Sequence, residues 1–236
     1  MNYNFSNESI QETRAHEIAN SFLSQVYVWM CFGLAVTGGI SWYAANSLWL
    51  IKMLFGSGSA PFLIIVIIQL GIVYYLSTRV TSLSPTAASG LFVIYAAING
   101  IIIAPIFLIY TRESIASTFF ITAGTFGAMS LYGYMTKKDL SGLRSFLIMG
   151  LIGLIIASVV NIWLKNQTMM WVVTYIGVIV FVLLTAYDTQ KIKQMAYNLD
   201  QNEELRSSVA VLGALSLYLD FINLFIYLLR ILGKNK

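Results

Sequence analysis

Residues 209–229 read VAVLGALSLYLDFINLFIYLL, an apolar run in which Asp220 is the only charged side chain. A run of about 20 apolar residues can cross the roughly 30 Å hydrocarbon core of a bilayer as an α-helix. The stretch therefore predicts a transmembrane helix with a carboxyl group near its middle. A carboxylate in or near hydrocarbon is costly, so an acidic residue at this position is a functional-site hypothesis.

The composition of the whole chain points to a membrane protein. Of its 236 residues 58% are hydrophobic and only 10% are charged, and the mean hydropathy is +0.77. Soluble domains average about 25% charged residues, so this chain has too little charge to cover a soluble surface. The net charge of +4 is spread along the chain and does not indicate nucleic-acid binding. Three prolines suit long helices.

The charged residues divide the chain into seven apolar segments, which predicts an all-α polytopic membrane protein with the lipid bilayer as its partner. We expect residues 1–21 to form a short polar cytoplasmic tail, either without regular structure or partly as an interfacial helix, and residues 22–232 to form one seven-helix transmembrane domain. Residues 189–208 are the longest predicted internal loop. We expect spans at about 22–44, 60–78, 88–109, 114–135, 145–164, 169–187 and 209–229.

The distribution of basic residues predicts the orientation, because cytoplasmic loops carry an excess of Lys and Arg. The expected orientation has the N-terminus in the cytoplasm and the C-terminus outside. With that orientation the outer loops carry only Lys52, Arg112 and Lys165, although Arg230, Lys234 and Lys236 near the C-terminus oppose it. The inner side carries Arg14, Arg79, Lys137, Lys138, Arg144, Lys191, Lys193 and Arg206.

Small residues recur four positions apart in three spans, at Ala35/Gly39, Ala96/Gly100 and Ala123/Gly127. Such pairs allow two membrane helices to approach closely. We interpret them as packing positions and not as chemistry.

Asp220 and Asp188 are the leading candidate site residues. Asp220 is expected to face the protein interior or a water-filled cavity, because lipid would exclude its charge. The alternative is a structural carboxyl hydrogen-bonded to another helix. Asp188, in LLTAYDTQKIK at residues 183–193, lies where the sixth span meets the cytoplasm. Taken alone it is best interpreted as an interfacial residue in water, but the antiparallel hairpin of spans six and seven brings it towards Asp220.

The predicted depths of the two carboxyls differ by roughly 10 Å at 1.5 Å per helical residue. The two carboxyl groups meet only if the sixth helix continues inward past its apolar run, or if a water-filled vestibule shifts the effective boundary of the membrane. Two carboxylates in contact cannot easily both ionise, so they share a proton and titrate as a unit. The ionised pair repels itself or binds a cation, and oxygen ligands of this kind suit Ca²⁺. A pH-sensitive gate with transient Ca²⁺ binding follows.

Three further residues have narrower interpretations. Arg79 ends the second span; it is either a positive-inside anchor or an ion-pair latch to Asp188 that favours the charged carboxylate. Cys31, the only cysteine, excludes an internal disulfide and is expected to be a small buried side chain. His16, the only histidine, lacks nearby ligands and makes a poor metal site, and we expect no resident cofactor.

The residues around both aspartates resemble the Bax inhibitor-1 (TMBIM) family over nearly the whole chain. The strongest marks are SLYLDFINLF at residues 216–225, continuing to LLRILG at 228–233, and Tyr187–Asp188 with the Gln-Lys-Ile that follows. GIIIAPIF at 100–107 is similar to the family's third-helix Gly/Pro segment, with Ala104 in place of the usual glycine. The likeness is strongest to bacterial inner-membrane members, which implies location in the bacterial inner membrane.

The resemblance implies six helices wrapped around a central seventh, and a pH-sensitive calcium leak controlled by an aspartate pair that falls here on Asp188 and Asp220. It also implies a second-helix arginine that pairs with the sixth-helix aspartate and falls on Arg79. A passive Ca²⁺ leak is the leading function. A regulatory protein that binds other membrane proteins is the alternative, since relatives modulate membrane proteases or cell death.

An intramembrane aspartyl protease is the third interpretation, because those enzymes also carry two membrane aspartates, one of them in a Tyr-Asp pair. They resemble each other through Gly-x-Gly-Asp and Pro-Ala-Leu segments. Here Asp220 follows Leu-Tyr-Leu and no Pro-Ala-Leu occurs. We therefore expect no enzymatic activity.

Overall fold

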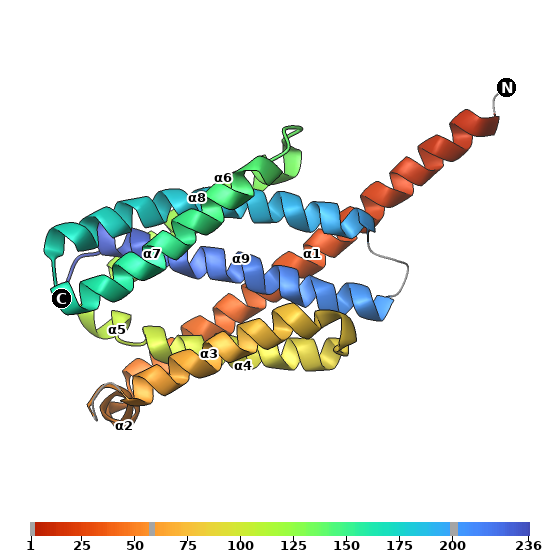
Figure 1. Ribbon diagram of the computed structural model, residues 1–236. Coiled ribbons are helices and arrows are strands. Elements are labelled where there is room, and N and C mark those ends of the chain that lie inside the picture. Colours follow the sequence, from red (N-terminus) through yellow and green to blue (C-terminus); the bar gives the residue numbers. More distant parts are fainter. Residues whose placement is uncertain (1–2, 57–59, 199–202) are drawn as a thin grey trace.

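The structure, a computed structural model, describes residues 3–56, 60–198 and 203–236 and is helical throughout its membrane part (Figure 1). Within these residues seven helices are long and apolar enough to cross a membrane, which confirms the predicted all-α polytopic fold. The α-helices are α1 (Tyr3–Ala45), α2 (Leu48–Ile51), α3 (Ala60–Arg79), α4 (Pro85–Ile103), α5 (Ile106–Ile109), α6 (Arg112–Met135), α7 (Arg144–Leu164), α8 (Gln167–Asn198) and α9 (Glu203–Leu232). A π-helical turn at Lys52–Gly56 and 3₁₀ turns at Val80–Ser82 and Ser141–Leu143 join some of them.

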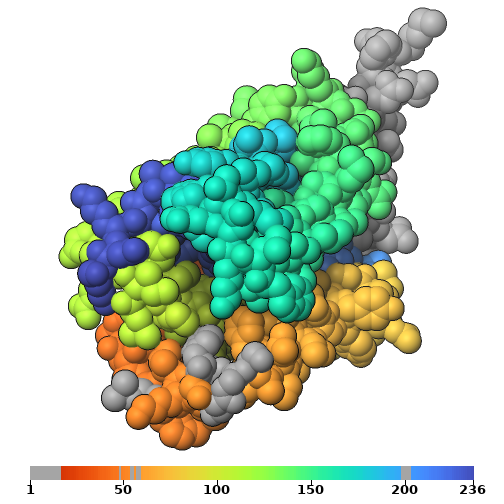
Figure 2. All heavy atoms as spheres, turned by 60° about the vertical axis from the view of Figure 1, so that its left-hand side comes forward, coloured from red at the N-terminus to blue at the C-terminus, as the bar shows by residue number. Residues whose placement is uncertain are grey.

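Helix α9 is the centre of the bundle. Of its most apolar window 72% is buried, against 11% for α3 and for α7. Helices α1, α4, α6 and α8 pack directly on α9, while α3 packs on α4 and α7 packs on α8. In the space-filling view of Figure 2, α7 and α3 cover much of the forward face and α9 is visible mainly at its ends. The implied central helix is therefore present, with four helices in contact with it and two on the outer flanks.

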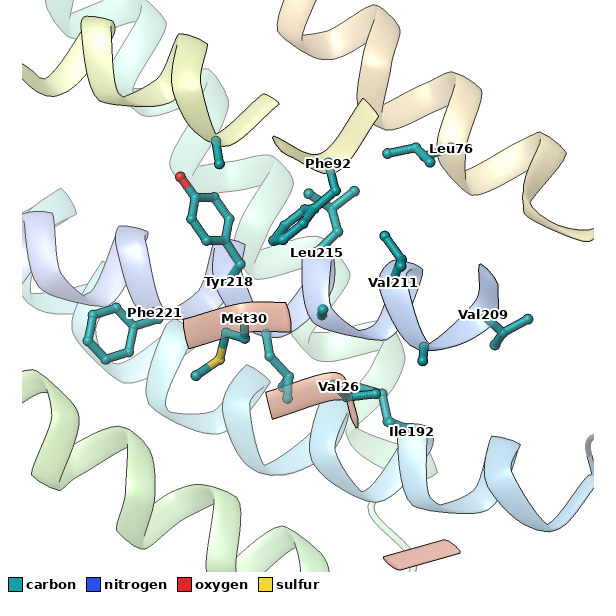
Figure 3. Packing of buried hydrophobic residues seen from close by; sticks show 14 of the residues in the cluster. Val26, Met30, Leu76, Phe92, Ile192, Val209, Val211, Leu215, Tyr218 and Phe221 are labelled. Carbon is teal, nitrogen blue, oxygen red and sulfur yellow. The ribbon is translucent and has the colours of Figure 1, made fainter. Parts of the chain in front are cut away.

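The interior of the bundle is built from large apolar side chains of α1, α4 and α9 around Tyr218 (Figure 3). Tyr218 is fully buried, and its ring meets that of Phe92 edge-on at 5.6 Å between centroids. Its hydroxyl accepts a hydrogen bond from Asn99 Nδ2 at 2.7 Å and lies 2.6 Å from Thr37 Oγ1. Because Thr37 donates to the carbonyl of Ala96, Tyr218 is the donor to Thr37, and this chain ties the three helices together.

Local sequence explains where several helices begin and end. Ser84 caps α4, accepting from the Ala87 N–H, and Pro85 occupies its first turn, where no N–H is needed. Thr111 caps α6 through the Ser114 N–H. Helix α4 ends at Ile103, directly before Ala104–Pro105, because proline lacks the N–H that a continuing helix requires. The interruption thus occurs even though Ala104 replaces the family's glycine.

One sequence prediction about the ends of spans needs correction. The loop predicted at residues 189–208 is largely helical, since α8 continues to Asn198 and α9 begins at Glu203. The charges of Lys191 and Lys193 marked the limit of the hydrocarbon and not the end of the helix, because a helix can extend into water. Residues of the predicted polar tail belong to α1 from Tyr3 onwards, and their position in the cytoplasm stays a prediction.

The two chain ends lie at opposite ends of the bundle (Figure 1). The C-terminal residues are held against the connection between α5 and α6. The Thr111 N–H donates to the Lys234 carbonyl at 3.0 Å, and the Lys236 N–H donates to the Ile109 carbonyl at 2.9 Å. These bonds fix the last turn of α9 relative to α6.

Candidate functional site

Asp220 lies at the middle of α9 in the packed interior. Its side chain is only 4% exposed. The buried Oδ2 atom receives no hydrogen bond from any residue that the structure describes. Asn223, one turn further on, does not supply one, because its amide donates to the Leu219 carbonyl at 2.8 Å. Asp220 is thus a buried carboxyl with an unused acceptor, which is a costly arrangement in an apolar interior.

Three contacts define how α8 and α9 pack as antiparallel neighbours. Arg230 Nη1 donates to Thr174 Oγ1 at 3.2 Å, Gly177 lies against the Tyr227 ring, and Gly213 lies against the Ile192 side chain. At this register Asp220 is level with Thr185. Asp188 lies about one helical turn from that level, or about 5 Å along the axis. This axial offset follows from the register of the two helices, whereas the depth difference of roughly 10 Å expected from the sequence came from the ends of the apolar runs and stays a prediction.

Asp188 lies in the C-terminal half of α8 and is partly buried. It is within electrostatic range of Asp220 and of the exposed Lys191. No hydrogen bond joins the two carboxyl groups in the described part of the chain. The structure therefore places the two aspartates as electrostatic neighbours on adjacent helices.

The residues that follow Asp188 anchor α8 to α6, a role that sequence reasoning missed. Thr189 Oγ1 lies 3.0 Å from Ser130 Oγ, and Ser130 in turn shares a short hydrogen bond with the Tyr27 hydroxyl of α1. Gln190 donates to the Lys138 carbonyl and accepts from the Leu140 N–H, both at 2.8 Å. Hydroxyl and amide side chains are common in membrane helices, so their partners could not be inferred from the sequence. They fix the position of the α8 turn that carries Asp188.

Arg79 ends α3, and its side chain is exposed. Among the residues that the structure describes it forms no ion pair with Asp188, and α3 packs on α4 and not on α8. The Arg79–Asp188 latch is thus not formed in this structure and stays a prediction.

Cys31 and His16 are the two remaining residues that the sequence singled out. Cys31 is exposed along α1, not buried as expected. The side chain of His16 lies outside the described residues. The described part of the chain contains no group of three or more His, Cys, Asp or Glu side chains that could hold a metal ion.

Comparison with known proteins identifies the family to which this chain belongs. A family model described as "Inhibitor of apoptosis-promoting Bax1" matches residues 19–236. The chain belongs to the Bax inhibitor-1 family. It is 51% identical over 232 residues to the inner membrane protein YbhL of Escherichia coli K12, covering 97% of both chains. It is 43% identical over 226 residues to an uncharacterized protein of Borreliella burgdorferi, covering 96% of this chain and 97% of that one.

A third Bax inhibitor-1 relative, an uncharacterized protein of Rickettsia prowazekii, is 42% identical over 215 residues, with 91% of this chain and 90% of that protein covered. The family match and the YbhL relative confirm the resemblance drawn from the residues around Asp188 and Asp220. The seven apolar helices of the described residues indicate a polytopic membrane protein. Its relative YbhL is an inner membrane protein.

Proposed function

We propose that this Bax inhibitor-1 protein is a pH-sensitive passive leak for cations, with Ca²⁺ as the cargo and Asp188 and Asp220 as the sensor and gate. The observation that carries the proposal is Asp220, whose buried Oδ2 has no hydrogen-bond donor in the described part of the chain. A carboxyl in this state is expensive in a protein interior, and such residues in membrane helices mark ion or proton pathways. The neighbouring carboxyl of Asp188 supplies the second half of the pair.

The chemistry of the proposed gate follows from the shared environment of the two carboxyls. With one proton between them, the pair carries a single negative charge and can close into a carboxyl–carboxylate hydrogen bond. Without that proton, two negative charges repel each other in a poorly hydrated interior, unless a cation lies between them. A hard divalent cation prefers oxygen ligands of this kind. Protonation therefore changes both the distance between α8 and α9 at this level and the affinity for cations.

An apolar cavity of about 360 Å³ lies beyond Asp220 towards the C-terminal end of α9. Phe221 and Phe225 of α9 line it together with Thr37 of α1, and Arg112 also contributes to the lining. A dry apolar passage is a barrier to ions even where it is wide enough to hold them. We propose that this cavity is the outer barrier of the pathway and conducts only when it is hydrated.

The test is Ca²⁺ flux into liposomes that contain the purified full-length protein and an enclosed Ca²⁺ indicator, measured over a series of pH values. We expect a flux that changes with pH, and we expect Asp220→Asn to abolish the pH response, because an amide cannot titrate. Asp188→Asn should have the same effect, since the pair acts as a unit.

Asp139→Asn is the matched control. Hydrogen bonds from Ser141 lower the pKa of the exposed Asp139 carboxyl, so its charge does not change near neutral pH. The control should keep the response of the unchanged protein. A pH response that persists in Asp220→Asn would rule out the pair as the sensor.

A further inference from the structure

Helices α1 and α6 flank a groove along the inner half of the bundle, which we call the α1–α6 groove. Both helices pack on α8 and α9 but scarcely on each other. The space between them measures about 800 Å³. Its walls are mainly apolar and include Leu23, Val28, Met30, Phe126 and Leu131. The groove is open to the side, so in a membrane it faces the acyl chains of the bilayer.

The length of the groove matches one leaflet. On α1 it runs from Asn20 to Cys31, which is about 16 Å at the helical rise of about 1.5 Å per residue. One leaflet contributes about half of the roughly 30 Å hydrocarbon core. Its floor is closed by the hydrogen bond between Tyr27 and Ser130 and by the Phe126 ring, which meets Phe221 of α9 at 5.5 Å between centroids. The shape is that of a slot for one extended acyl chain.

A basic pocket of about 280 Å³ adjoins the polar end of the groove, and Tyr134 lines both. The Tyr134 hydroxyl donates to Asn20 Oδ1 at 2.6 Å. Lys193 Nζ donates to the Tyr134 carbonyl at 2.8 Å and lies 4.5 Å from the centre of the Tyr134 ring. Lys137 and Lys138, both exposed, complete the cationic lining.

One carboxylate, that of Asp139, shares this pocket. One of its oxygens accepts a hydrogen bond from the Ser141 N–H at 2.9 Å, so part of its negative charge is already used within the chain. Three ammonium groups against one carboxylate leave the pocket with an excess of positive charge. An apolar slot one leaflet long that ends at a cationic pocket is complementary in shape and charge to a phospholipid with a negatively charged headgroup.

We propose that the α1–α6 groove and the basic pocket together bind one anionic phospholipid, with an acyl chain in the groove and the phosphate against Lys137, Lys138 and Lys193. Basic residues at the membrane surface attract anionic headgroups, and cationic pockets beside membrane helices hold them specifically. A zwitterionic lipid can fill the groove but gains little from the lysines. The proposal does not depend on ion conduction or on the aspartate pair.

The first experiment compares lipids. The purified full-length protein in detergent is titrated with phosphatidylglycerol and with phosphatidylcholine of the same acyl chains, and the bound lipid is counted by native mass spectrometry. We expect one phosphatidylglycerol to bind about tenfold more tightly than phosphatidylcholine, because several lysines face the headgroup. Equal affinities would overturn the proposal. Displacement of the lipid by millimolar inorganic phosphate would also overturn it, since the pocket would then be a phosphate site.

The second experiment fills the groove. Gly127 lines it, and a Cβ atom added there meets no atom within 4 Å, so the side chain of Gly127→Leu begins in open space at the groove. Gly124→Leu is the matched control, because Gly124 lies one turn away on α6, does not line the groove and is equally open. We expect Gly127→Leu to weaken phosphatidylglycerol binding about tenfold or more and Gly124→Leu to leave it unchanged. The same effect in both variants would contradict the site.

The third experiment removes the charge. The triple variant Lys137→Gln, Lys138→Gln and Lys193→Gln should lose the preference for phosphatidylglycerol, whereas Lys52→Gln, on a different connection, should keep it. Circular dichroism establishes that each variant retains its helices. If the triple variant does not fold, the two glycine variants decide the question alone. A folded triple variant that still prefers phosphatidylglycerol would exclude the lysines as the headgroup site.

Discussion

Asp220 illustrates, at the scale of a single residue, the cost of a functional group in a packed interior. Its Oδ2 is buried without a donor from the described residues, while apolar side chains of α9 surround it. An unsatisfied buried polar group costs about 1–3 kcal/mol. Proteins keep such groups where function requires them, so replacement often raises stability and removes activity.

Asp220→Asn is therefore expected to melt at a higher temperature than the unchanged protein. The amide can donate a hydrogen bond to the Asp188 carboxylate, and because it cannot ionise, the variant never carries two neighbouring negative charges. The gain should be about 1–3 kcal/mol in the free energy of unfolding. Thermal unfolding in detergent, followed by circular dichroism near neutral pH, measures it, with Asp139→Asn as the control that should not change. A lower melting temperature would mean that the Asp220 carboxyl contributes to stability.

Tyr218→Phe is expected to destabilise the bundle, although it keeps the ring and its packing. The variant removes the hydroxyl that accepts from Asn99 and donates to Thr37, and it leaves the buried Asn99 amide without that acceptor. The cost should be about 1–3 kcal/mol. Tyr74→Phe is the control, because Tyr74 is 72% exposed on α3. Equal melting temperatures for both variants would show that the hydrogen-bond chain contributes nothing.

Small residues show how far sequence spacing predicts individual contacts. Of the three pairs spaced four apart, Ala96/Gly100 packs as predicted, since a Cβ on Gly100 would lie 2.7 Å from the Thr37 carbonyl oxygen. The prediction was wrong for Gly39 and Gly127, where a Cβ would meet nothing within 4 Å. The spacing shows that one face of a helix carries side chains small enough for another helix to approach closely. It does not show which neighbour lies opposite that face.

At the scale of helices, the contact between α6 and α8 depends on a glycine that no sequence pattern singled out. Gly133 is buried, and a Cβ added there would overlap the backbone of Ala186 on α8. The bond of Ser130 with Thr189 joins the two helices on one side of Gly133, and the bond of Gln190 with Lys138 joins α8 to the connection that follows α6 on the other. The α8 turn with Asp188 is thus fixed by close backbone packing as well as by hydrogen bonds.

Gly133→Ala is expected to force α6 and α8 apart and to lower the melting temperature, because the obstructing atoms are backbone and cannot rotate away. Overpacking of this kind costs about 1–3 kcal/mol. Gly127→Ala, on the same helix in open space, should be neutral or slightly stabilising, since alanine favours a helix over glycine. If both variants have the same melting temperature, α6 and α8 are not in close contact at this level.

Helix lengths were predicted well at one end of α8 and poorly at the other. The start at Gln167 lies close to the predicted residue 169, but the end at Asn198 lies beyond the predicted 187. Hydropathy reports where hydrocarbon ends, and charged residues such as Lys191 and Lys193 can continue a helix in water. The axial offset between Asp188 and Asp220 is set by the register of the two helices and not by this extension. The register of α8 on α9 depends on Gly177, Gly213 and Arg230, whose partners only a structure provides.

At the scale of the whole molecule, the number of spans and the family were predictable because both depend on long runs and on a specific stretch around Asp220. The arrangement was predictable only through the resemblance, since hydropathy cannot tell a central helix from an outer one. The fifth span shows this: α7 is as apolar as the core helices but lies on the flank, with 11% of its window buried. Its apolar residues meet lipid, which is as good a solvent for them as the protein interior.

The orientation of the bundle is the last prediction, and it belongs to the molecule as a whole. The structure places the two termini at opposite ends, and the excess of basic residues predicts that the N-terminal end faces the cytoplasm. In a variant with Cys31→Ala, single cysteines are introduced by Lys137→Cys, between α6 and α7, and by Lys165→Cys, between α7 and α8.

A membrane-impermeant maleimide added to intact bacterial cells, after removal of the outer membrane barrier, should label Lys165→Cys and not Lys137→Cys. Both should react after the inner membrane is opened, which establishes that each thiol is reactive. The reverse pattern would turn the bundle over and place the basic pocket on the outer leaflet. It would leave the fold unchanged, because the packing of α9 within the bundle does not depend on which side of the membrane its ends face.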